Sequence, residues 1–241
     1  MDECSSKRAA ALGALELVKR LEPGVVGVGT GSTVAEFIDI ASETLSGSVV
    51  LASSIDTELR LRDAGIRVSS QTGGLKPDVY IDGADEVDPW GRLVKGGGGA
   101  LLGEKILAYN SRVNIIIVDE GKLVEMLGSR KPVPIEVVPH ALGYVIDRLD
   151  DWGYNPRPRM SGGKAGPVVS DWGGIIVDLH MGPIEDPEGL DIRLKTVPGI
   201  VETGIFHGIV DYLVVGYTEC KWRVYQVGRK PTDRLFDRQV H

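Results

Sequence analysis

Apolar runs of three to six residues alternate with longer amphipathic stretches through the first half of the chain. The short runs predict β-strands, and the longer stretches, whose apolar residues recur at helical spacing, predict helices. The predicted strands are Val25 to Gly29, Val49 to Leu51, Ile66 to Val68, Val79 to Ile81 and Val113 to Val118. The predicted helices are Lys7 to Leu21, Thr33 to Ser42, Ile55 to Ala64 and Gly99 to Tyr109. Strands separated by helices imply a parallel sheet with right-handed crossovers, in which active sites lie at the carboxyl ends of the strands.

The pattern changes near Lys131. The next predicted elements are a strand at 132–138, a helix at 141–152, strands at 157–160 and 175–180, a helix at 188–196 and a strand at 200–206. This β-α-β-β-α-β order predicts a small ferredoxin-like α+β domain. Strands at 211–215 and 222–227 then return to the first domain. We therefore predict one domain from residues 1–130 and 206–241, and a second from residues 131–205.

Length, net charge and the distribution of apolar residues disfavour a nucleic-acid-binding or membrane protein. The 241 residues are enough for two modest domains with real cores, and the formal net charge is −7. A negative chain is a poor match for nucleic acid or an anionic membrane. No apolar run approaches 18 residues and the N-terminus does not resemble a secretory signal, so we expect a cytoplasmic protein.

The cysteines and histidines predict no metal site. Only two cysteines are present, Cys4 and Cys220, far apart and in no ligand-like spacing, so we expect neither a disulfide scaffold nor structural zinc. The four histidines show no metal-binding spacing either.

The first candidate site is the glycine-rich turn Gly27 to Thr33, between a predicted strand and a predicted helix. Glycines let a ligand approach the backbone, and the helix N-terminus presents unpaired N–H groups to an anion. The turn is either a phosphate cradle, with hydroxyl donors at Thr30, Ser32 and Thr33, or a tight turn in which Ser32 caps the helix. A dinucleotide site needs an acidic residue after the next strand, which instead ends in Ala52-Ser53-Ser54.

The second candidate is the acidic segment Asp82 to Asp88, directly after a predicted strand. Four carboxylates in seven residues are open to three interpretations: a solvated loop, a divalent metal site or a site that binds sugar hydroxyls. In the last case Asp82 and Asp85 contact the sugar, and the small residues Gly83 and Ala84 let it lie against the backbone. No further cluster of ligands completes a metal shell.

The third candidate runs from Lys95 to Lys105 and contains four consecutive glycines, Gly96 to Gly99. Such a run is flexible and typical of a loop that folds over a ligand. Glu104, in the following helix, either points back toward this loop or pairs with a basic residue on the helix surface. Lys122 follows the strand at 113–118. It is either a surface charge or a further ligand-binding residue of the site formed by the glycine-rich loop.

Together these segments resemble the ribose-5-phosphate isomerase type A family, in order and spacing over nearly the whole chain. The resemblance also includes Ser53-Ser54, the segment 133–137 and the segment 198–201. It implies a Rossmann-like domain with a smaller lid domain, assembled as a homodimer or homotetramer. The implied activity is interconversion of ribose 5-phosphate and ribulose 5-phosphate in the non-oxidative pentose phosphate pathway, without metal or cofactor. The stretch from Arg157 to Gly174 does not align with the family pattern.

The resemblance also implies roles for individual residues. Glu104 would be the proton acceptor, Lys95 would stabilise the enediolate, and Asp82 would help to open the sugar ring. The expected substrate-binding residues are Thr30, Gly31, Ser32, Thr33, Asp82, Gly83, Ala84, Asp85, Lys95, Gly96, Gly97, Gly98 and Lys122. Moving a proton between C2 and C1 needs a base in a partly dry pocket and a group that stabilises the oxyanion, and these residue types fit that need.

Two other classes fit part of the pattern. A sugar-phosphate sensor would use the phosphate turn without needing Glu104 or Lys95, but the negative net charge and the lack of a helix-turn-helix-like extension count against it. An amino-sugar phosphate deaminase or an acyl-CoA transferase uses a related fold. A deaminase is expected to need a histidine near its carboxylates, and His140 is not placed for that role.

Overall fold

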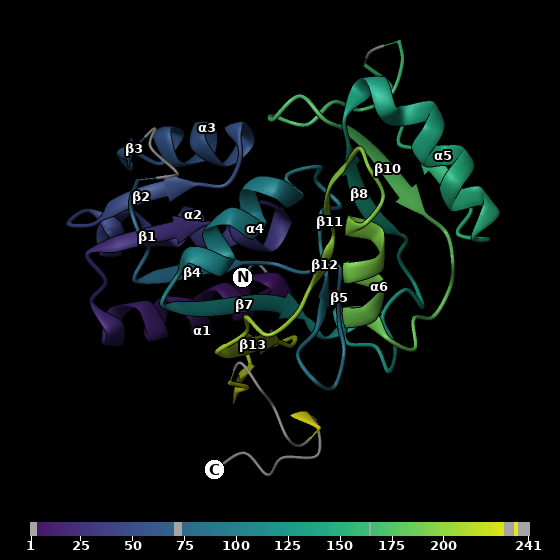
Figure 1. Ribbon diagram of the computed structural model, residues 1–241. Coiled ribbons are helices and arrows are strands. Elements are labelled where there is room, and N and C mark those ends of the chain that lie inside the picture. The colour runs from purple at the N-terminus through teal and green to yellow at the C-terminus, as the bar shows by residue number, and fades with distance from the viewer. Residues whose placement is uncertain (1–3, 70–73, 164, 229–233, 236–241) are drawn as a thin grey trace.

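Seven strands form one central sheet in the order β14-β13-β7-β4-β1-β2-β3 (Figure 1). The structure is a computed structural model that describes residues 4–69, 74–163, 165–228 and 234–235. The strands are β1 (Val25–Val28), β2 (Val49–Ala52), β3 (Val68–Ser69), β4 (Val79–Asp82), β7 (Val113–Asp119), β13 (Tyr212–Gly216) and β14 (Trp222–Gln226). Every neighbouring pair is parallel except β13 with β14. The predicted parallel sheet is confirmed.

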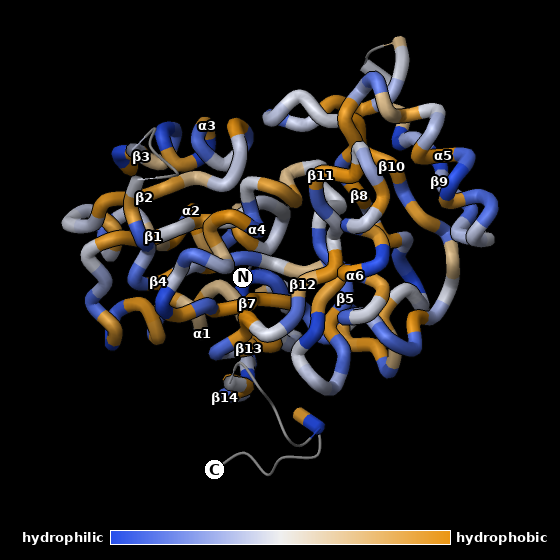
Figure 2. The backbone as a smooth tube through the Cα atoms, viewed as in Figure 1, coloured by the Kyte–Doolittle hydropathy of each residue, from blue (hydrophilic) through white to orange (hydrophobic). Residues whose placement is uncertain are grey.

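Helices cover both faces of this sheet, because residues along each strand alternate between two apolar cores. The helices are α1 (Ser6–Leu21), α2 (Ser32–Leu45), α3 (Ile55–Asp63) and α4 (Leu101–Asn110). Val50 and Ile115 belong to the core beneath α1, α2 and α3, whereas Leu51 and Ile116 belong to the core beneath α4. Strands buried on both sides appear in the sequence as unbroken apolar runs. Figure 2 accordingly shows β1, β2 and β7 coloured mainly as hydrophobic.

A second sheet forms the part of the chain that we call the lid, residues 131–205. Its elements are β8 (Val133–Val137), α5 (Leu142–Asp151), β9 (Pro156–Pro158), β10 (Ile175–Leu179), α6 (Pro187–Lys195) and β11 (Ile200–Thr203). The strands pair antiparallel in the order β11-β8-β10-β9. The helices pack through Leu149 and Leu194 onto a core that includes Ile135 and Val177. The predicted ferredoxin-like arrangement is confirmed, and the exact boundaries of the lid stay a prediction.

The single strand predicted at 200–206 is divided in two by Gly204. β11 ends at Thr203, and β12 (Ile205–Phe206) joins a separate small sheet with β5 (Glu86–Val87) and β6 (Leu93–Val94). The main chain of Gly204 bonds to Lys95 on one side and Pro134 on the other. A Cβ at Gly204 would lie 2.3 Å from the carbonyl oxygen of Lys95, so only glycine fits at this crossing.

The two cysteines form a disulfide, contrary to the expectation from their spacing. Cys4 precedes α1 and Cys220 lies in the turn between β13 and β14, with 5.3 Å between their Cα atoms. The helix α1 packs so closely on β13 that a Cβ at Gly216 would lie 1.9 Å from the carbonyl oxygen of Ser6. The fold therefore brings the two cysteines together across a sequence separation of 216 residues.

Removing this disulfide is expected to lower the free energy of unfolding by roughly 2–5 kcal/mol, because the cross-link restricts the unfolded chain over a long loop. The measurement is urea unfolding of the protein with and without a thiol reductant. The matched control is the double variant Cys4→Ser/Cys220→Ser, whose unfolding should not respond to reductant. Equal midpoints for the oxidised protein and the double variant would contradict the prediction.

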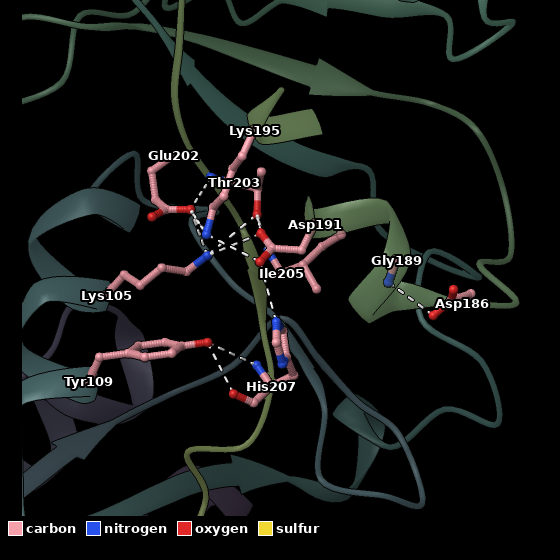
Figure 3. Close-up of polar contacts among 10 residues, drawn as sticks. All are labelled: Lys105, Tyr109, Asp186, Gly189, Asp191, Lys195, Glu202, Thr203, Ile205 and His207. Carbon is pink, nitrogen blue, oxygen red and sulfur yellow. Dashed lines mark hydrogen bonds and ion pairs between the residues drawn. The ribbon is translucent and has the colours of Figure 1, made fainter. Parts of the chain in front are cut away.

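A buried ionic network joins α4 to the lid (Figure 3). Lys105 Nζ of α4 lies 2.9 Å from Glu202 Oε1 and 3.6 Å from Asp191 Oδ1. Lys195 Nζ lies 3.1 Å from Asp191 Oδ2 and 2.8 Å from Glu202 Oε1. Burial lowers the pKa of Lys105, and the two carboxylates oppose that effect. The network therefore holds the buried carboxylate of Asp191 and the half-buried carboxylate of Glu202 between two lysines, at the junction of α4, α6 and β11.

Asp191 is the most heavily bonded member of this network. The Thr203 hydroxyl donates to its Oδ1 at 2.5 Å, and His207 Nε2 lies 3.3 Å from its Oδ2. Burial raises the pKa of Asp191, but the hydrogen bonds and nearby lysines outweigh burial and hold it well below its usual range. Asp191 therefore stays ionised and fixes α6 against the chain that returns from the lid.

None of the described helices is long and apolar enough to cross a membrane.

Candidate active site

One pocket opens at the carboxyl ends of β1 and β4, beside the first turns of α2 and α4. It holds about 440 Å³ of empty space, part of it open to solvent. Its lining residues are Thr30, Gly31, Ser32, Thr33, Val34, Gly83, Ala84, Asp85, Lys95, Gly96, Gly97, Gly98, Glu104 and Lys122. The structure thus brings together every residue predicted for the site except Asp82, which lies buried beneath the pocket wall.

The turn after β1 leaves the N-terminus of α2 open toward the pocket. Gly31 is the N-cap residue at a φ of 135°, and no side chain caps the helix. The alternative in which Ser32 caps the helix is not what the structure shows, since Ser32 is the first helical residue. The N–H groups of a first helical turn have no partners within the helix, and they favour an anion. An anion seated there would also meet the half-buried Lys122 across the pocket.

The Thr30 hydroxyl lies in a cluster of hydroxyl groups. Its Oγ1 lies 2.8 Å from Ser53 Oγ, 2.7 Å from Ser54 Oγ and 3.0 Å from Thr57 Oγ1. Ser54 also caps α3 by accepting from the N–H of Thr57. The serine pair, which in the sequence marked the end of a strand and formed part of the family resemblance, therefore ties the turn after β1 to α3.

Asp82 and Lys95 form a buried ion pair below the pocket. Lys95 Nζ lies 2.6 Å from Asp82 Oδ2 and donates to the carbonyl of Gly83 at 2.7 Å. Asp82 also accepts from the Tyr80 hydroxyl at 2.5 Å and from the N–H of Thr30 at 3.2 Å. Burial lowers the pKa of Lys95, but the Asp82 and Glu104 carboxylates reverse that effect and raise it overall. Lys95 is therefore a fixed cation at the pocket wall.

Glu104 occupies the first turn of α4 and is only 2% exposed. Its Oε2 lies 3.4 Å from Lys95 Nζ, within ion-pair distance but without the geometry of a hydrogen bond, and has no hydrogen-bond partner among the described residues. Burial, followed by the negative charge of Asp82, raises the pKa of Glu104 to about 8, although Lys95 opposes the shift. Such a carboxylate is a strong base that the protein leaves free for another atom.

The acidic segment divides between the pocket and the scaffold. Asp85 lines the pocket and accepts from the N–H of Gly97 at 2.8 Å. Glu86 is buried elsewhere and accepts from backbone N–H groups at 128, 130 and 131. Asp88 pairs with Arg92 at 2.6 Å. The four carboxylates therefore do not form one cluster, and the described residues contain no group of three or more that could hold a metal ion.

The lid meets the first domain beside the pocket through residues that sequence reasoning did not assign. Asp171 Oδ2 accepts from the N–H of Ile55, the first residue of α3, at 2.8 Å. A Cβ at Gly103 would lie 2.1 Å from the carbonyl oxygen of Ser53 and 3.1 Å from Trp172 Nε1. The stretch 157–174, which matched no motif, thus touches α3 and also α4, the helix that carries Glu104.

Comparison with known proteins now identifies the family. The sequence model described as Ribose 5-phosphate isomerase A (phosphoriboisomerase A) matches residues 49–220. Ribose-5-phosphate isomerase A of Aeropyrum pernix is 50% identical over 228 residues, which cover 93% of this chain and 96% of that protein. The chain belongs to the ribose 5-phosphate isomerase A family. Ribose-5-phosphate isomerase A of Thermococcus kodakarensis is 43% identical over 218 residues, covering 88% of this isomerase and 94% of that protein.

Solved structures agree with the family assignment. A D-ribose-5-phosphate isomerase in complex with phospho-erythronic acid has a TM-score of 0.86 and 39% identity, covering 94% of this isomerase and all of that chain. Ribose 5-phosphate isomerase A from Methanocaldococcus jannaschii has a TM-score of 0.84 and 34% identity, covering 92% and 98%. The predicted fold class is confirmed, as is the prediction of an enzyme that interconverts ribose 5-phosphate and ribulose 5-phosphate.

Proposed function

We propose that this isomerisation takes place in the pocket described above, with Glu104 as the base. The observation that carries the proposal is the buried Oε2 of Glu104, which has no hydrogen-bond partner among the described residues while its neighbour Lys95 is held by Asp82 and Gly83. In the open-chain aldose, Glu104 takes the proton from C2 as the electrons move onto the oxygen of C1. The resulting enediolate receives a proton at C1 from Glu104, and the C2 hydroxyl proton passes to O1, which leaves a ketone at C2.

Lys95 is placed to stabilise the enediolate, because its cationic Nζ lies at the pocket wall 3.4 Å from the base. A fixed charge near a developing oxyanion typically contributes about 10²–10³-fold to rate. Asp82 does not line the pocket, so it acts on the reaction by holding Lys95 in place. We therefore assign Asp82 as a positioning residue, and not the ring-opening role expected from sequence. Asp85 and the small residues Gly83 and Ala84 line the wall where sugar hydroxyls would lie.

The phosphate is proposed to bind the open N-terminus of α2, through Ser32 and Thr33, with Lys122 opposite. The solved relative bound to phospho-erythronic acid supports a site for a phosphorylated sugar acid. The carboxylate of phospho-erythronic acid is planar and has two oxygens, and in both respects it resembles the enediolate intermediate. Phospho-erythronic acid is therefore a suitable probe of this pocket. Assay of ribulose 5-phosphate formation, with that compound as inhibitor and with or without a chelator, tests the assignment directly.

The value of kcat/KM is expected to rise with pH from 7, to reach half of its maximum near pH 8 and to level off above about pH 9. A base acts only when ionised, and a carboxyl with a pKa of about 8 is mostly protonated at neutral pH in the free enzyme. The measurement is kcat/KM for ribose 5-phosphate from pH 6.5 to 9.5 at constant ionic strength. A profile that is flat from pH 7 to 9 would show that the base titrates elsewhere.

A homodimer or homotetramer acting in the cytoplasm also remains a proposal. Half of the exposed large apolar side chains come from the lid: Val138, Tyr144, Met160, Val169, Trp172, Ile192 and Val201. Exposed apolar side chains favour contact with another copy where they gather into one patch, and sedimentation of the purified protein measures the assembly. The disulfide is uncommon for a cytoplasmic protein, although intracellular proteins of hyperthermophiles are a known exception.

A further inference from the structure

Arg159, in the part of the lid that matched no motif, reaches the glycine-rich loop of the pocket. Its Nη1 donates to the carbonyl oxygens of Gly96 at 2.9 Å and Gly97 at 2.8 Å. The other edge of the guanidinium is bound by Asp178 of β10, with Nε to Oδ2 at 2.9 Å and Nη2 to Oδ1 at 2.5 Å. Two parallel bonds of this kind fix the plane of the guanidinium and therefore the direction in which Nη1 points.

The main chain of Arg159 is equally well fixed. Its N–H donates to the carbonyl of Ile176 at 2.9 Å, and its carbonyl accepts from the N–H of Val168 at 2.7 Å. The side chains of Arg159 and Asp178 are 19% and 14% exposed, so water competes little for the pair. The contact with the glycine loop therefore comes from a rigid element of the lid.

Within the loop, the N–H of Gly99 donates to the carbonyl oxygen of Gly96 at 3.0 Å, whereas the carbonyl oxygen of Gly97 has Arg159 as its only hydrogen-bond donor among the described residues. Gly96 and Gly99 have φ values of 96° and 77°, which favour glycine and leave an unrestrained loop many alternatives. The N–H of Gly97 donates to Asp85, so a carboxylate of the first domain holds one side of the loop and Arg159 of the lid holds the other.

The orientation of one peptide group follows from this arrangement. In a trans peptide the C=O and the next N–H point in opposite directions. Because the carbonyl of Gly97 points at Arg159, the N–H of Gly98 points the other way, and Gly98 lines the pocket. Among the described residues this N–H has no hydrogen-bond acceptor.

We propose that Arg159 is a positioning residue of the isomerisation: it holds the carbonyl oxygen of Gly97 away from the pocket and so presents the N–H of Gly98 to an oxygen of the bound sugar phosphate. Without the guanidinium, the peptide between Gly97 and Gly98 can rotate and direct the carbonyl oxygen of Gly97 at an anionic substrate, which it would repel. The peptide between Gly96 and Gly97 stays in place, because Gly99 and Asp85 bond to it. This inference rests on the proposed site and adds a residue of the lid to it.

The test is chemical rescue of Arg159→Ala. This variant is expected to lose about 10²-fold in kcat/KM, the typical effect of removing one oriented donor, and to bind phospho-erythronic acid more weakly in calorimetry. Millimolar guanidinium chloride should restore at least tenfold of the activity, because the acceptors at Asp178 and Gly96 remain in place to bind it and the carbonyl of Gly97 can turn back toward it. Sodium chloride at the same ionic strength should not. Arg157→Ala, which removes an exposed arginine two residues earlier, is the matched control and should behave as the unaltered protein.

The outcomes separate this inference from the proposed function. Failure of the unaltered protein to form ribulose 5-phosphate would remove the proposed function itself. An active unaltered protein whose Arg159→Ala variant keeps kcat/KM within threefold, or folds normally but is not rescued by guanidinium, would overturn the role of Arg159. If Arg159→Ala does not fold, Arg159→Lys is the deciding variant, because lysine keeps the positive charge but cannot bond to Asp178 and to the glycine loop through separate N–H groups of one plane. A tenfold or greater loss of kcat/KM with an unchanged melting temperature supports the role of Arg159. A smaller loss of kcat/KM overturns it.

Discussion

Replacing Glu104 by Gln is expected to lower kcat by roughly 10²–10⁴-fold while leaving KM within a few-fold, because Gln keeps the shape of the side chain but cannot accept the C2 proton. Steady-state kinetics with ribose 5-phosphate measures both constants. Loss of exchange of the C2 proton with solvent, followed by NMR, would show that the deprotonation step itself is affected. A variant with near-normal kcat would place the base at another residue.

The stability of the same variant provides the control. The pKa of Glu104 rises from its usual value near 4.5 to about 8 in the folded protein. Between those values the folded state holds a proton that the unfolded state releases, so the folded protein loses stability as pH rises through this window. Gln does not titrate, so Glu104→Gln should be at least as stable as the unaltered protein, and increasingly more stable toward pH 8. A variant that unfolds more easily at pH 8 would make its kinetic loss uninterpretable and contradict the assigned electrostatics.

Replacing Lys105 by Met is expected to lower the free energy of unfolding by about 3 kcal/mol, toward the lower end of the range for breaking a buried ion pair. The substitution leaves Glu202 and Asp191 with one lysine fewer, although Lys195 still bonds to both. It also removes a cation that lies 4.7 Å from the ring of Phe206. Urea unfolding measures the change.

The matched control for Lys105→Met is Lys195→Met. Lys195 joins the same two carboxylates, but its side chain is 37% exposed, so water can replace much of its contribution. The Lys195 variant should therefore lose clearly less stability than the Lys105 variant. Equal losses, or a change below 1 kcal/mol for Lys105, would mean that the buried network does not hold α4 to the lid.

The fold was predictable where strands and helices bury many residues. A strand such as β7, seven residues long and buried on both faces, gives an apolar run that cannot be mistaken for a loop. The strands β5, β6 and β12 have two residues each, too few for any periodicity, and the small sheet that they form was missed. The helix α4 begins at Leu101, and not at the predicted Gly99, because Gly99 has a positive φ that ends the preceding turn.

The site was predictable where chemistry is concentrated in short segments. Glycine turns, an acid-rich strand end and Glu104 stand out in sequence, and the parallel sheet brings them to one pocket. The contributions of Ser53, Thr57 and Asp171 depend on contacts between segments far apart in the chain, which no local pattern records. Arg159 is the clearest case, since nothing near it in sequence distinguishes it from Arg157. Its role depends on contacts with Asp178, Gly96 and Gly97, which are far from it in the chain or on another domain.

The bond between Cys4 and Cys220 also changes what cleavage of the chain can do. Everything from α1 to β13, the lid included, lies within one covalent ring. A protease that cuts a single peptide bond anywhere inside that ring opens it but releases no fragment, because both pieces remain on the same molecule through sulfur. A nicked enzyme can thus keep its halves at high effective concentration, and its cut ends become separable only once the sulfurs are reduced.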